Sequence, residues 1–312
     1  RKEEPMTPNS IIQYFADLPF DDTWSFVGLS TKDTTYISHS YHRYPAKFIP
    51  QLARRLIEEY TQPGALVCDP FMGSGTALVE AIVSGRRALG VDINPVAWLI
   101  SKTKTTPIEP SKLNKEFTLL VQKLHSQPPL FDFVEQGVEM TVPSHERIDY
   151  WFPQDIKLIS SRILAQLNAV QDDDCRRFFT CGFSHILKNC SIWLMRSTKP
   201  TRDFNKVIPD PTETFIKHVK RMVRKNQELW HLTDGSYSCV VQCTDARSLP
   251  TEDSSVNLIV TSPPYVTSYE HADIHQLTAL WLEYASDGNK YRAYYGKSHH
   301  RNQRGELPHL CG

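Results

Sequence analysis

Residues 261–265, which read Thr-Ser-Pro-Pro-Tyr, follow directly on the apolar run 256–260, a pattern that predicts a buried strand. Prolines cannot donate to a sheet ladder, so the two prolines end this strand and stiffen the backbone where its carboxyl end opens into a crevice. The Ser262 hydroxyl and the proline carbonyls can accept hydrogen bonds from an amine, and Tyr265 can stack on a flat ring. The pattern therefore indicates a site for a planar substrate with an amino group. On turn chemistry alone, a simple strand-ending turn is the alternative.

A second candidate binding element lies upstream, where an expected strand, 65–69, runs through a glycine loop into an expected helix, 77–83. Gly73 and Gly75 let the backbone approach a ligand closely, and the start of the helix offers amide donors. The loop lacks the glycine spacing of a dinucleotide site and the Gly-Lys-Ser/Thr ending of a phosphate loop. Asp69, directly before the loop, would repel phosphates and suits a cationic or amine-bearing ligand.

Two further expected strands also lead into acidic residues. The strand 87–91 is followed by Asp92, about twenty positions after the glycine loop, where an acidic side chain typically binds ribose hydroxyls. A helix cap is the alternative role for this residue. The strand 238–242 is followed, after a short polar turn, by Asp245. Because the carboxyl ends of parallel strands share one edge, we expect these groups to form one crevice with the residues after strand 256–260.

Together, these motifs resemble those of the S-adenosylmethionine-dependent methyltransferases that modify exocyclic amino groups of DNA bases. Residues 69–76, Asp-Pro-Phe-Met-Gly-Ser-Gly-Thr, resemble the cofactor loop of that family, and residues 261–265 resemble its catalytic tetrapeptide with one preceding residue. Residues 42–50 are similar to the element that covers the methionine end of the cofactor. The resemblance extends over roughly residues 38–102 and 236–285. It implies an α/β fold, a Rossmann-like class I methyltransferase sheet, with S-adenosylmethionine as cofactor.

The resemblance also assigns roles to single residues: Asp92 would bind ribose, and Asp245 would sit near the adenine. The implied cofactor-binding set is Tyr44, Pro45, Ala46, Lys47, Asp69, Pro70, Phe71, Gly73, Ser74, Gly75, Thr76, Asp92, Asn94, Asp245 and Thr261. The implied catalytic set is Ser262, Pro263, Pro264 and Tyr265.

The implied chemistry depends on how the target amine is held. Its lone pair is delocalised into the ring, which makes it a poor nucleophile. If the Ser262 hydroxyl and the Pro263 carbonyl accept its hydrogens, the nitrogen moves toward tetrahedral geometry and can attack the sulfonium methyl in line, so positioning supplies most of the catalysis. Tyr265 would stack on a base that has left the duplex, at an unstacking cost of about a few kcal/mol. No covalent enzyme intermediate is required.

The identity of the methylated base depends on the first position of the tetrapeptide. In the family, serine there leans toward the N4 amine of cytosine, and aspartate is more typical of adenine N6. Ser262 therefore favours cytosine in duplex DNA, with adenine N6 as the alternative. RNA is a further alternative substrate, since the amine chemistry would serve either nucleic acid.

The distribution of charge bears on DNA binding more than the total does. The chain has 35 basic and 35 acidic residues, and a net charge of zero argues against a nucleic-acid partner. Basic side chains nevertheless cluster within 188–225 and again within 290–304. The stretch 196–206 is rich in turn residues and is the candidate DNA-contacting loop, whereas 217–225 fits a solvated helix face. The candidate DNA-binding residues are Arg196, Lys199, Arg202 and Lys206.

Length and cysteine content indicate a soluble intracellular enzyme of 312 residues. The seven cysteines are odd in number and form no Cys-x-x-Cys pair, which predicts free thiols in a reducing compartment. With neither a signal sequence nor a run of membrane-spanning length, the expected location is the cytoplasm, and no membrane partner is expected. Cys175, Cys181, His185 and Cys190 match no common zinc spacing, so no metal site is predicted.

Three segments are expected along the chain. Residues 1–102 form the first part of the catalytic domain with the cofactor loop, 103–235 form a mostly helical insertion that reads the target, and 236–312 carry the tetrapeptide and a basic tail. Within the insertion, the apolar stretch 178–195 predicts a buried helix. Four strands are evident, fewer than the full sheet of the family, and residues 24–27 could supply another.

The sheet is therefore expected to be incomplete at its carboxyl end. The chain would then be a fragment, the amino half of a split enzyme, or an enzyme whose insertion holds unrecognised strands. An unfinished parallel sheet would need a second polypeptide, and such a subunit would bind cofactor or DNA without activity alone. If the enzyme belongs to a restriction-modification system, a cognate restriction endonuclease is the other expected partner.

Overall fold

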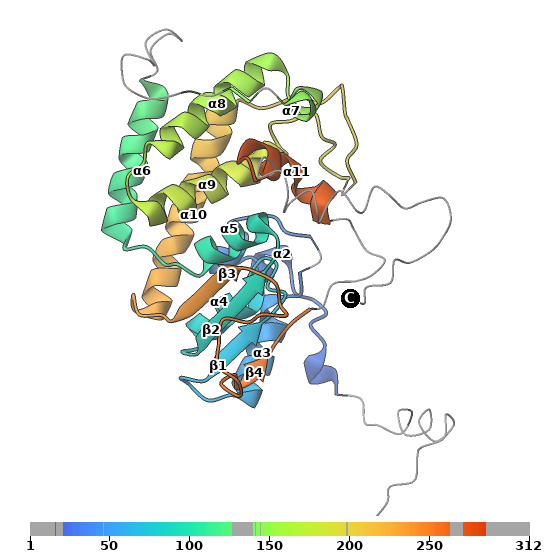
Figure 1. Ribbon diagram of the computed structural model, residues 1–312, viewed down its shortest axis with the longest axis vertical. Helices are drawn as coiled ribbons and strands as arrows, with labels where there is room; N and C mark the ends of the chain where they lie inside the picture. The colour runs from blue at the N-terminus through green and yellow to red at the C-terminus, as the bar shows by residue number, and fades with distance from the viewer. Residues whose placement is uncertain are drawn as a thin grey trace, which may run out of the picture.

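The computed structural model describes residues 16, 21–126, 140–262 and 271–284, except residues 46, 141, 144 and 198. A parallel sheet with its helices forms the lower part of Figure 1, and a group of packed helices forms the upper part. The long helix α10 runs along both parts, so the two are joined by continuous secondary structure as well as by loops.

The sheet contains all four of the expected strands. They are β1 (Leu66–Asp69), β2 (Arg87–Asp92), β3 (Cys239–Cys243) and β4 (Leu258–Ile259). All are parallel and their order is β3-β2-β1-β4, with Cys68 of β1 facing Leu89 on one side and Ile259 on the other. The chain moves outward from β1 through β2 to β3 and then returns to the other side of β1. This reversal is the topological switch point of a doubly wound sheet, and it confirms the Rossmann-like α/β prediction.

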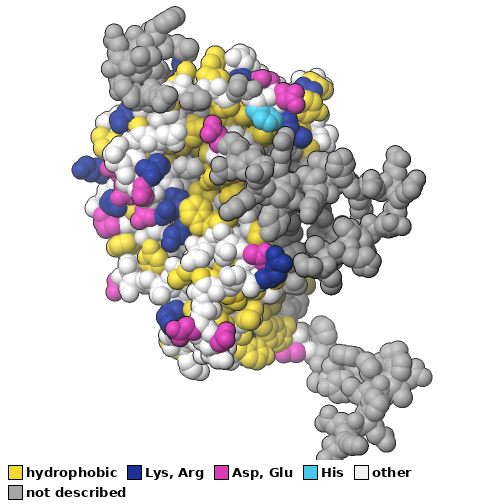
Figure 2. All heavy atoms as spheres, viewed as in Figure 1, with side chains coloured by type: hydrophobic (Ala, Val, Ile, Leu, Met, Phe, Trp, Pro, Cys, Tyr) yellow, Lys and Arg dark blue, Asp and Glu magenta, His cyan; other side chains and the backbone are white. Residues whose placement is uncertain are grey.

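Helices cover one face of the sheet. They are α3 (Pro50–Tyr60), α4 (Thr76–Val83) and α5 (Pro95–Lys104). Leu78 of α4 and Trp98 of α5 belong to the same apolar cluster as Val241 of β3. Alternate residues of a strand point to opposite faces of the sheet. Val240, which precedes Val241 in β3, is therefore exposed, and so is Ile259 of β4. Figure 2 shows hydrophobic side chains at the surface in the lower part of the molecule, where Figure 1 places β4.

A second layer of helices lies above the sheet in Figure 1. Its members are α6 (Pro110–His125), α7 (Glu146–Trp151), α8 (Gln154–Asn168), α9 (Asp173–Leu187), α10 (Pro211–Thr233) and α11 (His271–Trp281). Short helical turns precede the sheet at η1 (Asp22–Trp24), α2 (Thr31–Thr34) and η2 (Ile37–Ser40). None of the helices in these described ranges is both long and apolar enough to cross a membrane.

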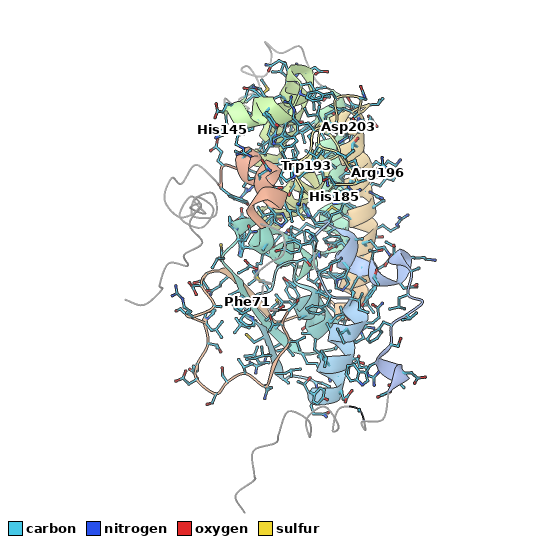
Figure 3. The ribbon with its side chains drawn as sticks, turned by 90° about the vertical axis from the view of Figure 1, so that its right-hand side faces the viewer. Phe71, His145, His185, Trp193, Arg196 and Asp203 are labelled. Carbon is cyan, nitrogen blue, oxygen red and sulfur yellow. The ribbon has the colours of Figure 1, made fainter. Side chains whose placement is uncertain are left out.

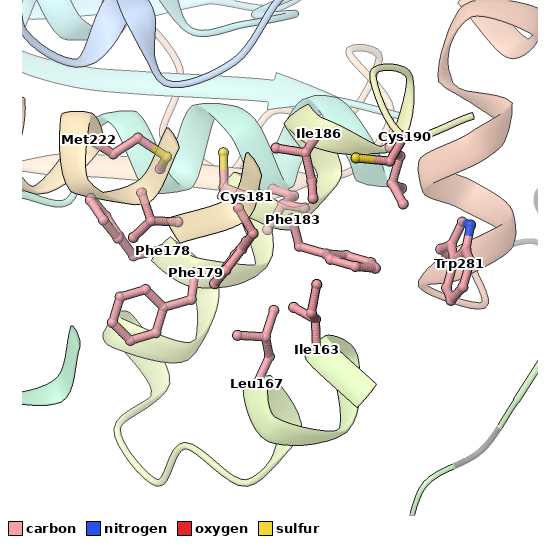
Figure 4. Packing of buried hydrophobic residues seen from close by; sticks show 14 of the residues in the cluster. Ile163, Leu167, Phe178, Phe179, Cys181, Phe183, Ile186, Cys190, Met222 and Trp281 are labelled. Carbon is pink, nitrogen blue, oxygen red and sulfur yellow. The ribbon is translucent and has the colours of Figure 1, made fainter. Parts of the chain in front are cut away.

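Helix α9 is the centre of the helical layer because its aromatic side chains pack against three neighbours (Figure 4). Phe179 and Phe183 lie beside Leu167 of α8, and the ring of Phe183 meets Trp281 of α11 edge-on with 5.7 Å between centroids. Met222 of α10 joins the same cluster. Burial of each such side chain contributes about 1.5–3 kcal/mol, so this core fixes α11 as well as the insertion helices.

Two expectations about local structure were wrong. Residues 24–27 do not form a strand: Trp24 ends η1, where the Asp21 side chain accepts from the Thr23 amide and the Arg55 guanidinium stacks on the Trp24 ring. The apolar helix expected over 178–195 begins earlier and ends at Leu187. Beyond that helix the chain turns so that Trp193 can form an antiparallel bridge with Arg202. Within the described residues, the stretch between β2 and β3 adds that single bridge and no strand.

Candidate active site

The loop between β1 and α4 is shaped by two glycines in left-handed conformations, at φ values of +48° for Gly73 and +72° for Gly75. Its backbone turns back on itself, since the Gly75 amide donates to the Met72 carbonyl at 2.7 Å. A Cβ on Gly73 would lie 3.2 Å from the Tyr44 ring, and one on Gly75 would lie 2.9 Å from Ser101 Oγ. The loop therefore needs glycine at both positions for space as well as for conformation.

Two side chains of α5 hold the carbonyl groups of this loop. Ser101 Oγ donates to the Gly73 carbonyl at 2.7 Å, and Lys104 Nζ donates to the Ser74 carbonyl at 3.0 Å. Lys104 is fully buried, and that burial lowers the pKa of its ammonium well below the usual range. Sequence reasoning missed both anchors. The sequence offered little signal for them, because Ser101 and Lys104 stand in a run of four polar residues at the end of α5.

Asp92, at the end of β2, binds the same loop from the other side. Its Oδ2 accepts from the Gly73 amide at 3.0 Å, and its Oδ1 accepts from the Asn94 amide at 2.9 Å. Asn94 in turn caps α5 by accepting from the Val96 amide at 2.9 Å. Each carboxylate oxygen can accept more than one hydrogen bond, so Asp92 keeps the capacity to bind ligand hydroxyls while it holds the loop.

Asp69, at the end of β1, is a buried carboxyl. Burial raises its pKa to about 6, although the Thr261 hydroxyl and the Phe71 amide, which donates to Oδ1 at 3.1 Å, act in the opposite direction. The negative charge of Asp92 raises the pKa further. A cation bound beside this carboxyl would favour its charged form and lower the pKa again.

Two partly exposed apolar side chains follow the ends of the two central strands. Phe71 is 42% exposed after β1, and Ile93 is 43% exposed after β2. Since β1 and β2 are neighbours, both residues lie at the carboxyl edge of the sheet beside Asp92. Such a pair suits the faces of a flat ring. Phe71 belonged to the expected set, whereas Ile93 was missed because only the polar residues at the strand ends were considered.

Tyr44 covers the glycine loop and connects it to α11. Its ring lies over Gly73, and its centroid is 4.9 Å from that of His275 in α11. Lys47 Nζ donates to the His39 carbonyl at 3.4 Å, and burial lowers the pKa of this ammonium. Pro45 is half-buried, and Ala46 lies outside the described residues.

Helix α11 is docked by buried polar contacts in addition to its apolar core. Gln276 Oε1 accepts from Trp151 Nε1 of α7 at 3.2 Å. Thr278 Oγ1 lies 2.7 Å from Ser184 Oγ of α9, which in turn lies 2.9 Å from His42 Nε2. Because α11 follows the expected catalytic residues 262–265 along the chain, these contacts fix the next described element after the candidate site.

The tetrapeptide itself lies only partly within the described residues. The Val260 amide donates to the Cys68 carbonyl at 3.0 Å, which brings Thr261 and Ser262 to the carboxyl edge beside Asp69. Both residues are partly exposed. Pro263, Pro264 and Tyr265 lie outside the described residues, so their roles remain predictions. At the other edge of the sheet, Asp245 accepts from the exposed Arg247 guanidinium at 2.8 Å.

The four candidate DNA-binding residues lie on one loop but differ in what they contact. Arg196 and Lys199 are exposed, and Arg202 makes cation–π contacts with two aromatic rings. Lys206 is engaged internally, because its Nζ donates to the carbonyls of Lys188, Ser191 and Trp193 at 2.8, 2.6 and 2.9 Å. Burial lowers the pKa of this ammonium to about 8. The geometry therefore assigns Lys206 to holding the loop.

Three cysteines and one histidine lie in or just after α9. Cys175, Cys181 and Cys190 are buried free thiols. The ring of His185 stacks on that of His218 with 3.8 Å between centroids, and burial lowers the pKa of both imidazoles. Across the part of the chain that the structure describes, no three ligand-type side chains come together in a way that could hold a metal ion.

Comparison with known proteins identifies related sequences over most of the chain. Residues 3–103 match the family model for DNA methylases of the N6/N4 type. The chain is 32% identical over 283 residues to the type II methyltransferase M.MvaI of Kocuria varians, covering 86% of this chain and 62% of that protein. It is 21% identical over 271 residues to M.BsoBI of Geobacillus stearothermophilus, covering 78% of this chain and 52% of that protein. A shorter match to M.MjaII of Methanocaldococcus jannaschii is 40% identical over 87 residues, 28% of this chain and 16% of that relative.

The chain thus spans less than two thirds of the length of each of these relatives. The family model and the type II relatives confirm the resemblance to the DNA amino-methyltransferases of the N4-cytosine and N6-adenine type. For that family the methyl donor is S-adenosylmethionine, as expected from the loop.

Proposed function

We propose that this chain, as a relative of the DNA amino-methyltransferases, transfers a methyl group from S-adenosylmethionine to the exocyclic N4 amine of a cytosine flipped out of duplex DNA. It would act in a restriction-modification system beside a cognate endonuclease. The observation that supports the proposal best is convergence at one sheet edge. The glycine loop, Asp69, Asp92 and Ser262 come from three adjacent parallel strands and meet at the switch point.

The crevice fits the chemistry of the cofactor. S-adenosylmethionine, when bound, supplies an electrophilic methyl group on a positively charged sulfonium. Asp69 offers a carboxylate that a cationic ligand would stabilise, and the Tyr44 ring packs closely over Gly73 and covers one side of the loop. Phe71 and Ile93 offer apolar surface for the adenine, and Asp92 offers acceptors for the ribose hydroxyls. Asn94 Nδ2, which has no hydrogen-bond partner among the described residues, is a further donor at this edge.

The residues of the tetrapeptide would hold the substrate. The Ser262 hydroxyl and the Pro263 carbonyl would accept the hydrogens of the amine, and Tyr265 would stack on the base. Held in this way, the amine nitrogen would take the methyl group in exchange for the carbon–sulfur bond of the donor and would then release one proton to solvent. These residues bind and orient the amine without forming a covalent bond to it, so removing one of them should reduce the rate through positioning.

The choice of cytosine rests on Ser262 and on the family's preference for serine with that base. A neutral hydroxyl accepts a hydrogen bond less strongly than a carboxylate, but that difference does not by itself distinguish a cytosine ring from an adenine ring. DNA would be held in part by Arg196 and Lys199, which are exposed on the loop after α9. The helices between β2 and β3 are the proposed target-reading region.

The direct test is transfer of labelled methyl groups. The purified chain is incubated with tritiated S-adenosylmethionine and mixed-sequence duplex DNA, and the DNA is digested to nucleosides. Label in N4-methylcytosine is the expected result. Label in N6-methyladenine would show that the target base is adenine, and label only in an RNA control would show that the substrate is RNA. The absence of both cofactor binding and methyl transfer would reject the proposal.

A second candidate function is a subunit that binds cofactor or DNA but needs another polypeptide for activity. The exposed Val240 and Ile259 favour it, because both faces of a parallel sheet are usually covered. Calorimetry separates the two functions: cofactor binding without label transfer is expected for this candidate, whereas transfer by the purified chain alone excludes it.

A further inference from the structure

An exposed aromatic side chain projects from the loop that follows α9. Phe204 is 74% exposed, and the guanidinium carbon of Arg202 lies 4.4 Å from its ring centroid. The same guanidinium carbon lies 4.1 Å from the ring centroid of Tyr150, which is 48% exposed. Arg202 therefore makes cation–π contacts with both Tyr150 and Phe204 at the surface, and we call these three residues the stacking ladder.

The loop that carries the ladder is firmly held. The Leu194 amide donates to the Thr201 carbonyl at 2.8 Å, and the Asp203 amide donates to the Ile192 carbonyl at 2.7 Å. Lys206 joins three further carbonyls of the same region. Below the loop, Trp193 stacks on the buried Trp151 with 4.9 Å between centroids. The exposed ring of Phe204 is thus presented by a braced backbone, which limits its ability to fold back onto the protein.

The charges around the ladder favour an anionic partner. Arg202 forms no ion pair with any described residue, so its positive charge is not neutralised by a carboxylate contact. Arg196 and Lys199 of the same loop are exposed, whereas the acidic Asp203 is partly buried and accepts from the Asn205 amide at 3.1 Å. A partner with negative charge and flat, apolar faces satisfies both the cations and the exposed ring.

The loop that carries the ladder belongs to the helical part of the molecule. Figure 3 labels Arg196 and Asp203 of this loop on the helical part and Phe71 on the sheet part.

We propose that a nucleobase of the bound DNA stacks on the outer face of Phe204, with Arg202 supporting the ring from behind through its cation–π contact. This inference rests on the proposed function and adds a binding surface outside the methyl-transfer crevice. Every base has a π face, so the contact tolerates different sequences and adds affinity without reading the target. The cation–π contact also explains why Phe204 is tolerated in water, since one of its faces is already covered by the guanidinium.

Substitutions at Phe204 separate stacking from other contacts. Fluorescence anisotropy is measured with a labelled mixed-sequence duplex and with labelled oligothymidine. Phe204→Ala should weaken binding to oligothymidine about 5- to 150-fold, the range expected for loss of one base–aromatic stack. Phe204→Trp should retain the affinity because it keeps a π face. Phe204→Leu should resemble Phe204→Ala, since it keeps apolar surface but lacks the ring.

A matched control lies in the same loop. Val207 is 92% exposed and takes no part in the ladder, so Val207→Ala should leave affinity unchanged. Salt dependence provides an independent readout: Phe204→Ala should preserve the slope of log Kd against log salt, whereas Arg196→Gln should reduce it by about 0.7–0.9 if it loses one phosphate contact. Because all these side chains are largely exposed, thermal unfolding should be the same for each variant.

The outcomes distinguish this inference from the proposed function. If the wild type methylates DNA and Phe204→Ala binds both probes equally well, the ladder proposal is overturned while the methyltransferase proposal stands. Full affinity in Phe204→Leu would also overturn it, because simple apolar contact would then suffice. If the wild type neither binds the probes nor transfers methyl groups, both the proposed function and the ladder proposal are rejected.

Discussion

Replacement of Gly75 by alanine tests whether close packing of the glycine loop positions the cofactor site. Gly75 adopts a left-handed conformation, and an added Cβ would lie 2.9 Å from Ser101 Oγ and 3.2 Å from Ser101 Cα. The backbone atom cannot rotate away, so either the loop or α5 must shift. A shift would stretch the hydrogen bond from Ser101 Oγ to the Gly73 carbonyl, now 2.7 Å.

The expected loss of stability has two parts. A left-handed conformation costs a non-glycine residue about 1–2 kcal/mol, and overpacking adds about 1–3 kcal/mol, so Gly75→Ala should lower the free energy of unfolding by about 2–5 kcal/mol. Gly64 is the matched control, because it is also left-handed, at φ +84°, but has no atom within 4 Å of an added Cβ. Gly64→Ala should lose only the conformational part, about 1–2 kcal/mol.

Urea unfolding measures the stability difference, and calorimetry measures cofactor binding. Loss of a hydrogen bond that holds the loop contributes about 0.5–1.5 kcal/mol, so S-adenosylmethionine should bind Gly75→Ala up to about tenfold more weakly. Gly64→Ala should bind it like the wild type. Equal destabilisation by the two substitutions, together with normal cofactor affinity in both, would refute the reasoning.

Three further predictions concern other parts of the site. The pKa of Asp69 rises on folding from 3.8 to about 6. The free energy of unfolding of the wild type, minus that of Asp69→Asn, should therefore fall by up to about 3 kcal/mol between pH 4 and pH 7. Parallel urea unfolding curves of the two proteins across that pH range measure this difference. Asp92→Ala should weaken cofactor binding in calorimetry, since the Gly73 amide loses its acceptor, whereas Tyr265→Ala should weaken base capture and leave cofactor affinity nearly intact. Gln276→Leu should lower kcat more than it lowers cofactor affinity, because it removes a contact that docks α11. The control is Asn226→Leu, which removes a buried side chain bonded to the Ile108 backbone and should lower only stability. Equal losses of kcat in the two variants would contradict the role given to α11.

The strands and the cofactor loop could be predicted because their signals are local. Apolar runs ending in Asp69 and Asp92 identify strands, and the glycines between them identify a close turn. The anchors Ser101 and Lys104 could not be predicted, since their partners are backbone carbonyls of a loop brought near only by packing. For the same reason, the sequence did not reveal that Asp92 would hold the loop amide as well as serve a ligand.

The predicted DNA loop illustrates a second limit. Basic composition selected Lys206 together with Arg196, but composition cannot show which ammonium turns inward to three carbonyls. Phe204 was overlooked because a lone aromatic in a polar stretch has no periodic pattern. Its exposure and its contact with Arg202 depend on a chain reversal that only the folded structure reveals.

Single-turnover methyl transfer by Ser262→Ala tests the central claim most directly. With labelled S-adenosylmethionine and duplex DNA, the variant should transfer methyl groups about a hundredfold more slowly than the wild type, because one acceptor that positions the amine is lost. Its affinity for the cofactor, measured by calorimetry on the same samples, should be unchanged. Wild-type transfer rates in the variant would contradict the assignment of this strand end as the site of amine methylation.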